Sequence, residues 1–226
     1  MRITSIRLRL SFAVLLAALL SGCASTPEAP AWQSSAYGSL QSFSSAYLSG
    51  SSRIADIEFA RARSELAATG RADLVAQAEL IRCAARVASL EFDSCAGFQA
   101  IAEDAGPAEH AYAAYIAGRW QGIDAALLPE HHRALLTGAA PSGATSRLAG
   151  IDDPLARLVA AGALLQNGQL APADIELATE TASAQGWRRP LLAWLGVQAQ
   201  RARQAGALDA HARIQRRIGL VGNLPK

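Results

Sequence analysis

Apolar residues recur every three or four positions from Arg53 to the C-terminus, and this periodicity constrains the fold more than any other feature of the sequence. In the first such stretch, one helix face carries Ala55, Phe59, Ala62 and Leu66. After Gly70 the same rhythm returns in Leu74, Ala78, Ile81, Ala85 and Ala88. Nowhere do apolar and polar residues alternate between turn signals, as they would in a strand. The pattern therefore predicts an all-α fold.

Glycine and proline divide the rest of the chain into further helices. Pro107 is expected to begin a helix that runs to about Gly118, and short helices should follow at 123–128 and 131–136. The glycine-rich stretch 138–150 is typical of a surface loop.

The C-terminal part contains the clearest helix signals. Asp153 and Pro154 form an N-cap and first-turn pair, and Pro172 and Pro190 are expected to begin the next two helices. Gly206 separates the third of these helices from a fourth.

Helix, glycine-containing turn and helix recur near Gly70, Gly168 and Gly206, and this arrangement resembles tetratricopeptide-type repeats. Leu170 and Ala173 suit the family, whereas large or charged residues occupy other positions where the family has Gly or Ala. The spacing between the first hairpin and the later ones is not a multiple of the repeat. The resemblance implies antiparallel helical hairpins, stacked in a tetratricopeptide-like array or forming an irregular bundle.

The N-terminus has the features of an export signal. Arg2, Arg7 and Arg9 precede an apolar run over residues 10–20, which is too short for a spanning helix. The run ends in Leu20-Ser21-Gly22-Cys23, which resembles the lipobox of bacterial lipoproteins. The resemblance implies cleavage before Cys23 and attachment of diacylglycerol and a further acyl chain to this residue. The alternatives are an ordinary cleaved signal with a chance cysteine, or an uncut anchor.

A three-part organisation follows from the lipobox. Residues 1–22 would be the cleaved signal peptide, and residues 23–52 a lipidated, Ser-rich tether. Within this tether the spacing predicts a short helix with Leu40, Phe43, Tyr47 and Leu48 on one face. Residues 53–226 would be the α-helical domain. Ala24 follows the cysteine, and in the enteric sorting rule this favours the outer membrane, with the domain facing the periplasm.

Charge argues against a nucleic-acid partner. The chain has 21 basic and 19 acidic residues, and three of the bases lie in the predicted signal. The mature part therefore has 18 bases and 19 acids, a net charge of −1. A nearly neutral domain has no general electrostatic attraction for nucleic acid.

The two remaining cysteines, Cys83 and Cys95, favour a disulfide because an even pair in an exported protein is usually oxidised. The segment after the turn at 91–94 could return along the helix that contains Cys83. The alternative is a pair of buried free thiols. A metal site is not expected, since no histidine lies near the cysteines at ligand spacing.

The sequence contains no catalytic motif. Glu130-His131-His132 lacks the spacing of four residues that helical zinc sites use, and it is interpreted as a solvated helix start. The acid pairs at 103–104 and 152–153 suit helix ends better than acid–base catalysis. No catalytic residue, cofactor or metal is predicted.

Four residues could form a ligand platform for a sugar ring or a peptide: Tyr112, Tyr115, Arg119 and Trp120. The alternative is that the aromatic side chains fill gaps in an alanine-rich core.

The resulting hypothesis is a lipid-anchored, periplasm-facing helical scaffold that binds protein partners in envelope assembly or maintenance. It is expected not to be an enzyme. The alternatives are a cell-wall glycan-binding or peptidoglycan-processing lipoprotein, which would use the aromatic platform, and a mainly structural envelope protein.

Overall fold

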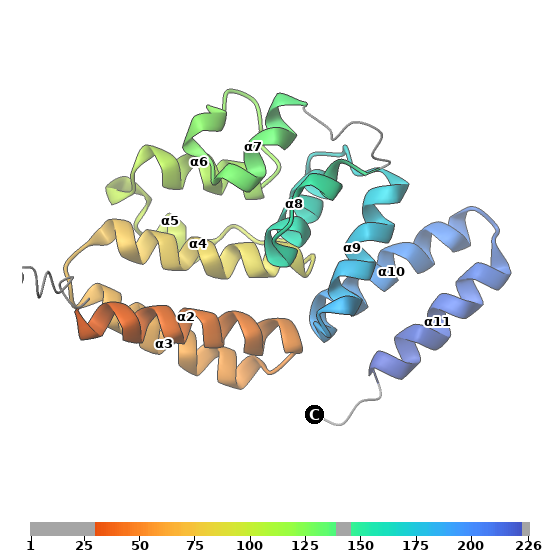
Figure 1. The fold of residues 1–226 in the computed structure, drawn as a ribbon, viewed down its shortest axis with the longest axis horizontal. Helices are drawn as coiled ribbons and strands as arrows, with labels where there is room; N and C mark the ends of the chain where they lie inside the picture. Colours follow the sequence, from red (N-terminus) through yellow and green to blue (C-terminus); the bar gives the residue numbers. More distant parts are fainter. Residues whose placement is uncertain (1–29, 139–145, 223–226) are drawn as a thin grey trace, which may run out of the picture. The chain divides into compact units, whose positions relative to one another are not determined.

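The fold is built entirely from helices and turns in the residues that the computed structural model describes, 30–138 and 146–222 (Figure 1). The predicted all-α fold of helical hairpins is confirmed. Cys23 and the rest of the lipobox lie outside the described residues. The α-helices are α2 (Ala31–Ser49), α3 (Ser52–Ala67), α4 (Ala72–Ala88), α5 (Ala96–Gln99), α6 (Pro107–Ile116), α7 (Glu130–Thr137), α8 (Pro154–Gln166), α9 (Pro172–Ala184), α10 (Arg188–Gln204) and α11 (Leu208–Gly222). Short 3-10 helices occur at Ala102–Asp104, Ala125–Leu127 and Arg147–Gly150.

Helix α4 lies between two parts of the hydrophobic core. On one side it packs with α2 and α3, which contribute the buried side chains Phe43, Leu48, Phe59 and Leu66. On the other side it packs with α5, α6 and α8, and this larger cluster continues into α9 and α10. Figure 1 shows the two layers on opposite sides of α4. The helix has ten buried residues, because it must present apolar surface in both directions.

Helix α2 is longer than the short helix that the sequence indicated. It begins at Ala31, so that much of the predicted tether is helical and packs against α3 and α4. Serine has a low helix propensity because its hydroxyl competes for backbone groups. Here Ser44 and Ser49 donate to the carbonyl oxygens four residues earlier, at 3.0 and 2.6 Å, which leaves the helix intact.

The close approach of α8 to α4 depends on a residue without a side chain. A Cβ on Gly162 would clash with the carbonyl oxygen of Val87. The neighbouring residues Ala160, Ala161 and Ala163 are small and fully buried. Small residues on one helix let the other approach closely, so this stretch of α8 fixes the centre of the core.

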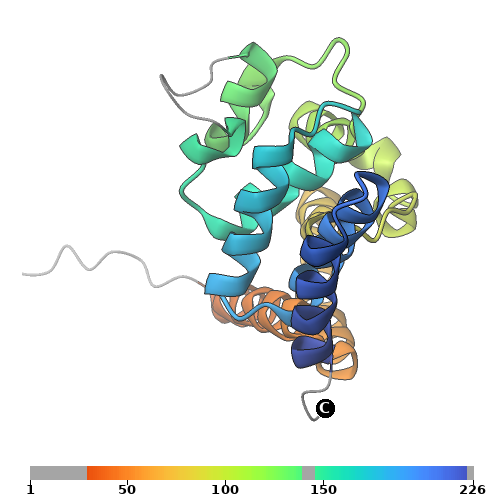
Figure 2. The same ribbon diagram turned by 90° about the vertical axis from the view of Figure 1, so that its right-hand side faces the viewer.

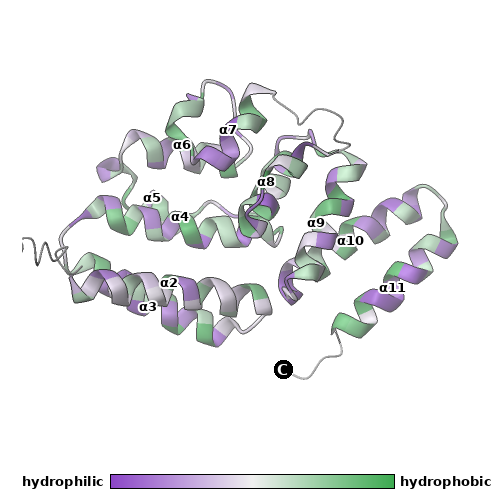
Figure 3. Cartoon of the chain, viewed as in Figure 1, coloured by the Kyte–Doolittle hydropathy of each residue, from purple (hydrophilic) through white to green (hydrophobic). Residues whose placement is uncertain are grey.

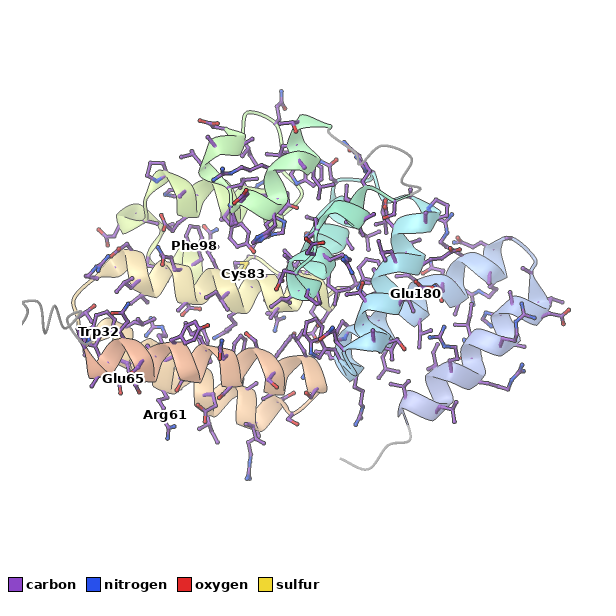
Figure 4. All side chains as sticks on the ribbon, in the orientation of Figure 1. Trp32, Arg61, Glu65, Cys83, Phe98 and Glu180 are labelled. Atoms are coloured by element: carbon purple, nitrogen blue, oxygen red, sulfur yellow. A yellow bond between two sulfur atoms is a disulfide. The ribbon has the colours of Figure 1, made fainter. Side chains whose placement is uncertain are left out.

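The predicted disulfide between Cys83 and Cys95 is present, and it joins α4 to the segment that leads into α5. The two Cα atoms are 5.7 Å apart, within the usual range for a disulfide. Cys83 is buried on the side of α4 that Phe98 also contacts (Figure 4). The bridge therefore holds the turn after α4 against the larger core.

Removing this bridge should lower the free energy of unfolding by about 3 kcal/mol, because the loop it closes gains freedom in the unfolded chain. We expect this loss in urea titrations of the double variant Cys83→Ala/Cys95→Ala and of the wild-type protein in reductant. Reductant should not change the stability of the double variant. Equal stability of the oxidised and reduced wild-type proteins would contradict a structural role for the bridge.

Arg189 connects the start of α10 to the N-terminal helices. Its guanidinium donates to the carbonyl oxygen of Tyr47 at 2.8 Å and to the hydroxyl of Ser52 at 2.6 Å. It also pairs with Glu91 at 2.9 Å and lies over the Tyr47 ring at 4.2 Å from its centre. One side chain thus joins α10, the turn between α2 and α3, and the loop after α4.

The segment 146–150 differs from the surface loop that the sequence predicted. Ser146 and Leu148 are buried, and Leu148 belongs to the larger core. The Ser146 hydroxyl donates to buried Asp174 at 2.7 Å, and Asp174 also accepts from the backbone of Arg147 and Ala171. Buried carboxylates need such partners, so this network fixes the segment onto α9. Residues 139–145 lie outside the described residues.

The helices in the described ranges are each too short or too polar to cross a bilayer.

Candidate functional site

Three adjoining pockets form an apolar groove across α2, α4, α6, α7 and α8. Ile81 of α4 lines all three, while Leu155 lines two of them and Tyr112 lines another two. The volumes are about 490 Å³ beside α2, 140 Å³ in the middle and 360 Å³ beside α6 and α7. Because the pockets share these lining residues, they lie next to one another, and we call the three together the Ile81 groove.

The α2 end of the groove has an apolar floor and a polar rim. Leu40, Leu48 and Ile81 meet Leu155 and Trp187 there. At the rim, the Gln41 side-chain amide donates to the Tyr37 hydroxyl at 2.7 Å, and both side chains are exposed. These two rim side chains bind each other, and the floor of this end is hydrophobic.

The α6–α7 end has the same character. Its apolar lining comes from Leu80, Ile81, Tyr112, Leu127 and Leu128. Gln77 donates to Glu109 at 2.9 Å, and Arg133 donates to the carbonyl oxygen of Leu128 at 2.8 Å. These contacts hold the charged side chains at the edge, and apolar surface forms the floor.

The structure brings together the three aromatic residues of the predicted platform as a stack. The ring centres of Tyr115 and Trp120 are 5.5 Å apart and their planes differ by 8°, while those of Tyr112 and Tyr115 are 6.2 Å apart. The Trp120 indole N–H donates to the carbonyl oxygen of Tyr115 at 2.9 Å. Tyr115 is fully buried in the core, and Arg119 is exposed. Of these four residues, Tyr112 lines the groove.

His132 completes this aromatic cluster from α7. Its ring lies 4.7 Å from that of Tyr115, and its Nδ1 is 3.1 Å from the Tyr115 hydroxyl. The Nε2 atom is buried without a hydrogen-bond partner among the described residues. Burial, and secondarily the charge of His131, lowers the pKa of His132 from 6.5 to about 3. The imidazole is therefore neutral at physiological pH.

The interpretation of 130–132 as a solvated helix start is wrong for His132, which is fully buried, and holds for exposed His131. The spacing contained a signal that could have corrected it. His132 precedes Leu135 by three residues and Leu136 by four within α7; Leu135 is buried and Leu136 packs against the core. Residues at these spacings share one helix face, so His132 lies on the apolar side.

The acidic residues in the groove serve structure. Asp153 lines the middle pocket, and its carboxylate accepts from the backbone N–H of Ala156 at 2.7 Å, as predicted for the N-cap of α8. Among the described residues, one group has side-chain ligand atoms close enough to hold a metal ion, namely Cys83, Asp93 and Cys95. The disulfide removes the two thiolates that such a site would use.

Sequence reasoning missed most of the groove. Tyr37 and Leu127 come from segments read as a tether and as a short helical piece, and both are exposed large side chains. Ile81 was recognised only as part of an apolar helix face. The groove forms where these faces meet, and nothing local marks it.

Comparisons with known protein families, with curated proteins and with solved structures found no match to this chain.

Proposed function

We propose that this protein is a lipid-anchored, periplasm-facing helical scaffold that binds a segment of a partner protein in the Ile81 groove. The partner would take part in envelope assembly or maintenance. The observation that carries the proposal is the groove, a row of three adjoining pockets whose lining is mainly apolar at both ends. Grooves between helical hairpins suit amphipathic helices and extended peptides.

The chemistry of the lining defines the occupant. The groove presents leucine, isoleucine and aromatic side chains, and its charged groups are engaged with neighbouring residues. An occupant must therefore supply apolar side chains at several positions and few charges. Separate subpockets at the two ends favour an apolar anchor in each, as in helix-in-groove recognition.

The lipid would determine where this groove acts. Several acyl chains hold a protein stably on a bilayer, because each buried methylene contributes about 0.8 kcal/mol. An anchor at Cys23 would concentrate the groove near the membrane and favour encounters with partners there. Export, cleavage and acylation at Cys23 are part of the proposal, and mass spectrometry of the mature N-terminus of wild-type and Cys23→Ala proteins tests them.

Site-specific photocrosslinking in living cells tests the groove. A photoreactive amino acid at Tyr37 or at Leu127 should capture the same partner, because these residues lie at opposite ends of the groove. The same amino acid at Ile57 should not, since α3 contributes to none of the three pockets.

With the photoreactive group kept at Tyr37, Leu127→Arg should lower the crosslinking yield about tenfold, equivalent to 1.4 kcal/mol of binding free energy. Leu127 is 38% exposed and Ile57 is 55% exposed, so arginine can be tolerated at either position. The matched variant Ile57→Arg should therefore leave the yield unchanged. Equal capture from the groove and from α3, or equal loss in both arginine variants, would contradict the proposal.

A glycan remains the alternative occupant, because Tyr112 from the predicted platform lines two of the pockets. Aromatic rings can stack on sugar rings. If the photoreactive group captures cell-wall fragments in place of a protein, and Leu127→Arg lowers that crosslinking yield by the same factor, the groove would be assigned to glycan binding.

A further inference from the structure

The last two helices carry a concentration of positive charge that the rest of the described domain lacks. Helices α10 and α11 contain seven arginines and one acidic residue, Asp209. Residues 31–187 contain 10 arginines and 17 acidic residues. The net charge of the chain is nearly neutral because a strongly basic C-terminal end offsets an acidic remainder.

Five of these arginines are exposed and have no carboxylate partner in the described ranges: Arg201, Arg203, Arg213, Arg216 and Arg217. The ion pairs found there join residues of α3, α4, the following loop and Arg189. The basic end therefore has guanidinium groups available for an external anion.

Helix α11 also exposes large apolar side chains among these arginines. It lies at one end of the helical array, in front of α10 in Figure 2, and all of its residues are at least partly exposed. Leu208 and Leu220 are 72% and 75% exposed. Ile214, Ile218 and Val221 pack toward the core. Figure 3 shows that α11 contains both hydrophilic and hydrophobic residues along its length.

The outer face has the spacing of an interfacial helix. Arg213 and Arg217 are four residues apart, as are Arg216 and Leu220, so all four lie on one side of α11. Arginine binds phosphate oxygens through two parallel hydrogen bonds. A leucine beside such arginines can enter the boundary between headgroups and acyl chains.

We propose that the outer face of α11, with the last turns of α10, is a docking surface for the anionic phospholipid headgroups of a membrane. Charge complementarity and the exposed Leu220 on the same side of α11 carry the proposal. A purely acidic protein surface would match the arginines but would leave Leu220 in water. The docking surface is separate from the Ile81 groove, so it stands or fails independently of the partner proposed there.

Hydrogen–deuterium exchange of the full-length protein in vesicles tests this surface. The protein is reconstituted in phosphatidylcholine vesicles and in vesicles that also contain phosphatidylglycerol. Amide exchange in residues 208–222 should slow at least fivefold in the anionic vesicles, while exchange in α3 stays the same. The protection should disappear in about 1 M salt, where the Debye length falls to about 3 Å.

Two charge-reversal variants distinguish binding by α11 from a general electrostatic attraction between the whole protein and the anionic vesicles. Arg213→Glu/Arg217→Glu should abolish the protection of α11. Arg53→Glu/Arg61→Glu makes the same change of charge on α3, where Arg61 points away from the core (Figure 4), and should retain the protection. Leu220→Ser should weaken it without a change of charge.

Identical exchange of α11 in neutral and anionic vesicles would overturn the proposal, as would equal loss of protection in the two double variants. Protection that rises with protein concentration in the absence of anionic lipid would identify a second copy as the occupant, and would also overturn it.

Discussion

Trp194→Ala will destabilise the protein by about 3–5 kcal/mol, the usual cost of removing a buried tryptophan. Trp194 is fully buried in α10, within the larger core cluster. Its indole N–H donates to the carbonyl oxygen of Ala88 at 3.1 Å, and Ala88 is the last residue of α4. The variant therefore leaves a cavity and also an unpaired carbonyl at a buried helix end.

Urea unfolding at neutral pH measures this loss of stability. Two further variants separate the contribution of packing from that of the hydrogen bond and test the effect of burial. Trp194→Phe keeps most of the packing and removes the hydrogen bond, so it should cost about 1–3 kcal/mol. Trp187→Ala removes the same side chain from a partly exposed position at the groove, and should cost less than half as much as Trp194→Ala. Similar losses in the two alanine variants would show that Trp194 does not anchor α10 to α4.

Acidification should destabilise the protein through His132. The folded-state pKa of His132 is about 3, below the ordinary value of 6.5 that applies in the unfolded chain. The unfolded state therefore binds a proton more readily, and the stability contributed by the neutral imidazole is complete above pH 6.5. This contribution falls by about 1.4 kcal/mol for each pH unit between the two pKa values.

Between about pH 7.5 and about pH 4.5, the wild-type protein should lose about 2–3 kcal/mol more than His132→Phe does. Carboxylates also titrate in this range, and comparison of the two proteins cancels their contribution. His131→Phe is the matched control: His131 is exposed, and burial is the larger cause of the lowered His132 pKa, so this variant should retain most of the wild-type pH dependence. Parallel pH profiles for the wild type and His132→Phe would rule out His132 as the acid-sensitive group.

The helices could be predicted from the sequence because their signals are local. The apolar spacing around Phe59 and Leu66 and the proline at position 107 correspond to α3 and α6. Asp153 caps α8 as its position before Pro154 indicated. The disulfide was also accessible, since Cys83 and Cys95 are separated by only 12 residues.

Tertiary packing decided the features that the sequence did not predict. Serine-rich α2 is helical as far back as Ala31 because Phe43 and Leu48 bury one side of it against α3 and α4. Leu148 is buried in a segment whose glycines suggested a surface loop. The two ends of the groove combine residues from α2, α6 and α7 with Ile81, and only the packing of these helices on α4 brings them together.

The α2 end of the groove combines residues that are made early and late in synthesis. Arg189 binds the carbonyl oxygen of Tyr47, which lies 142 residues earlier, and Trp187 shares a pocket wall with α2. At about 5–20 residues per second, a ribosome needs roughly 7–28 s to add the 142 residues that separate Tyr47 from Arg189. During that interval the N-terminal helices lack the side chain that joins them to α10. The wall that Trp187 adds is completed only after the start of α10 has been made, so the α2 end of the groove depends on residues far apart in the chain.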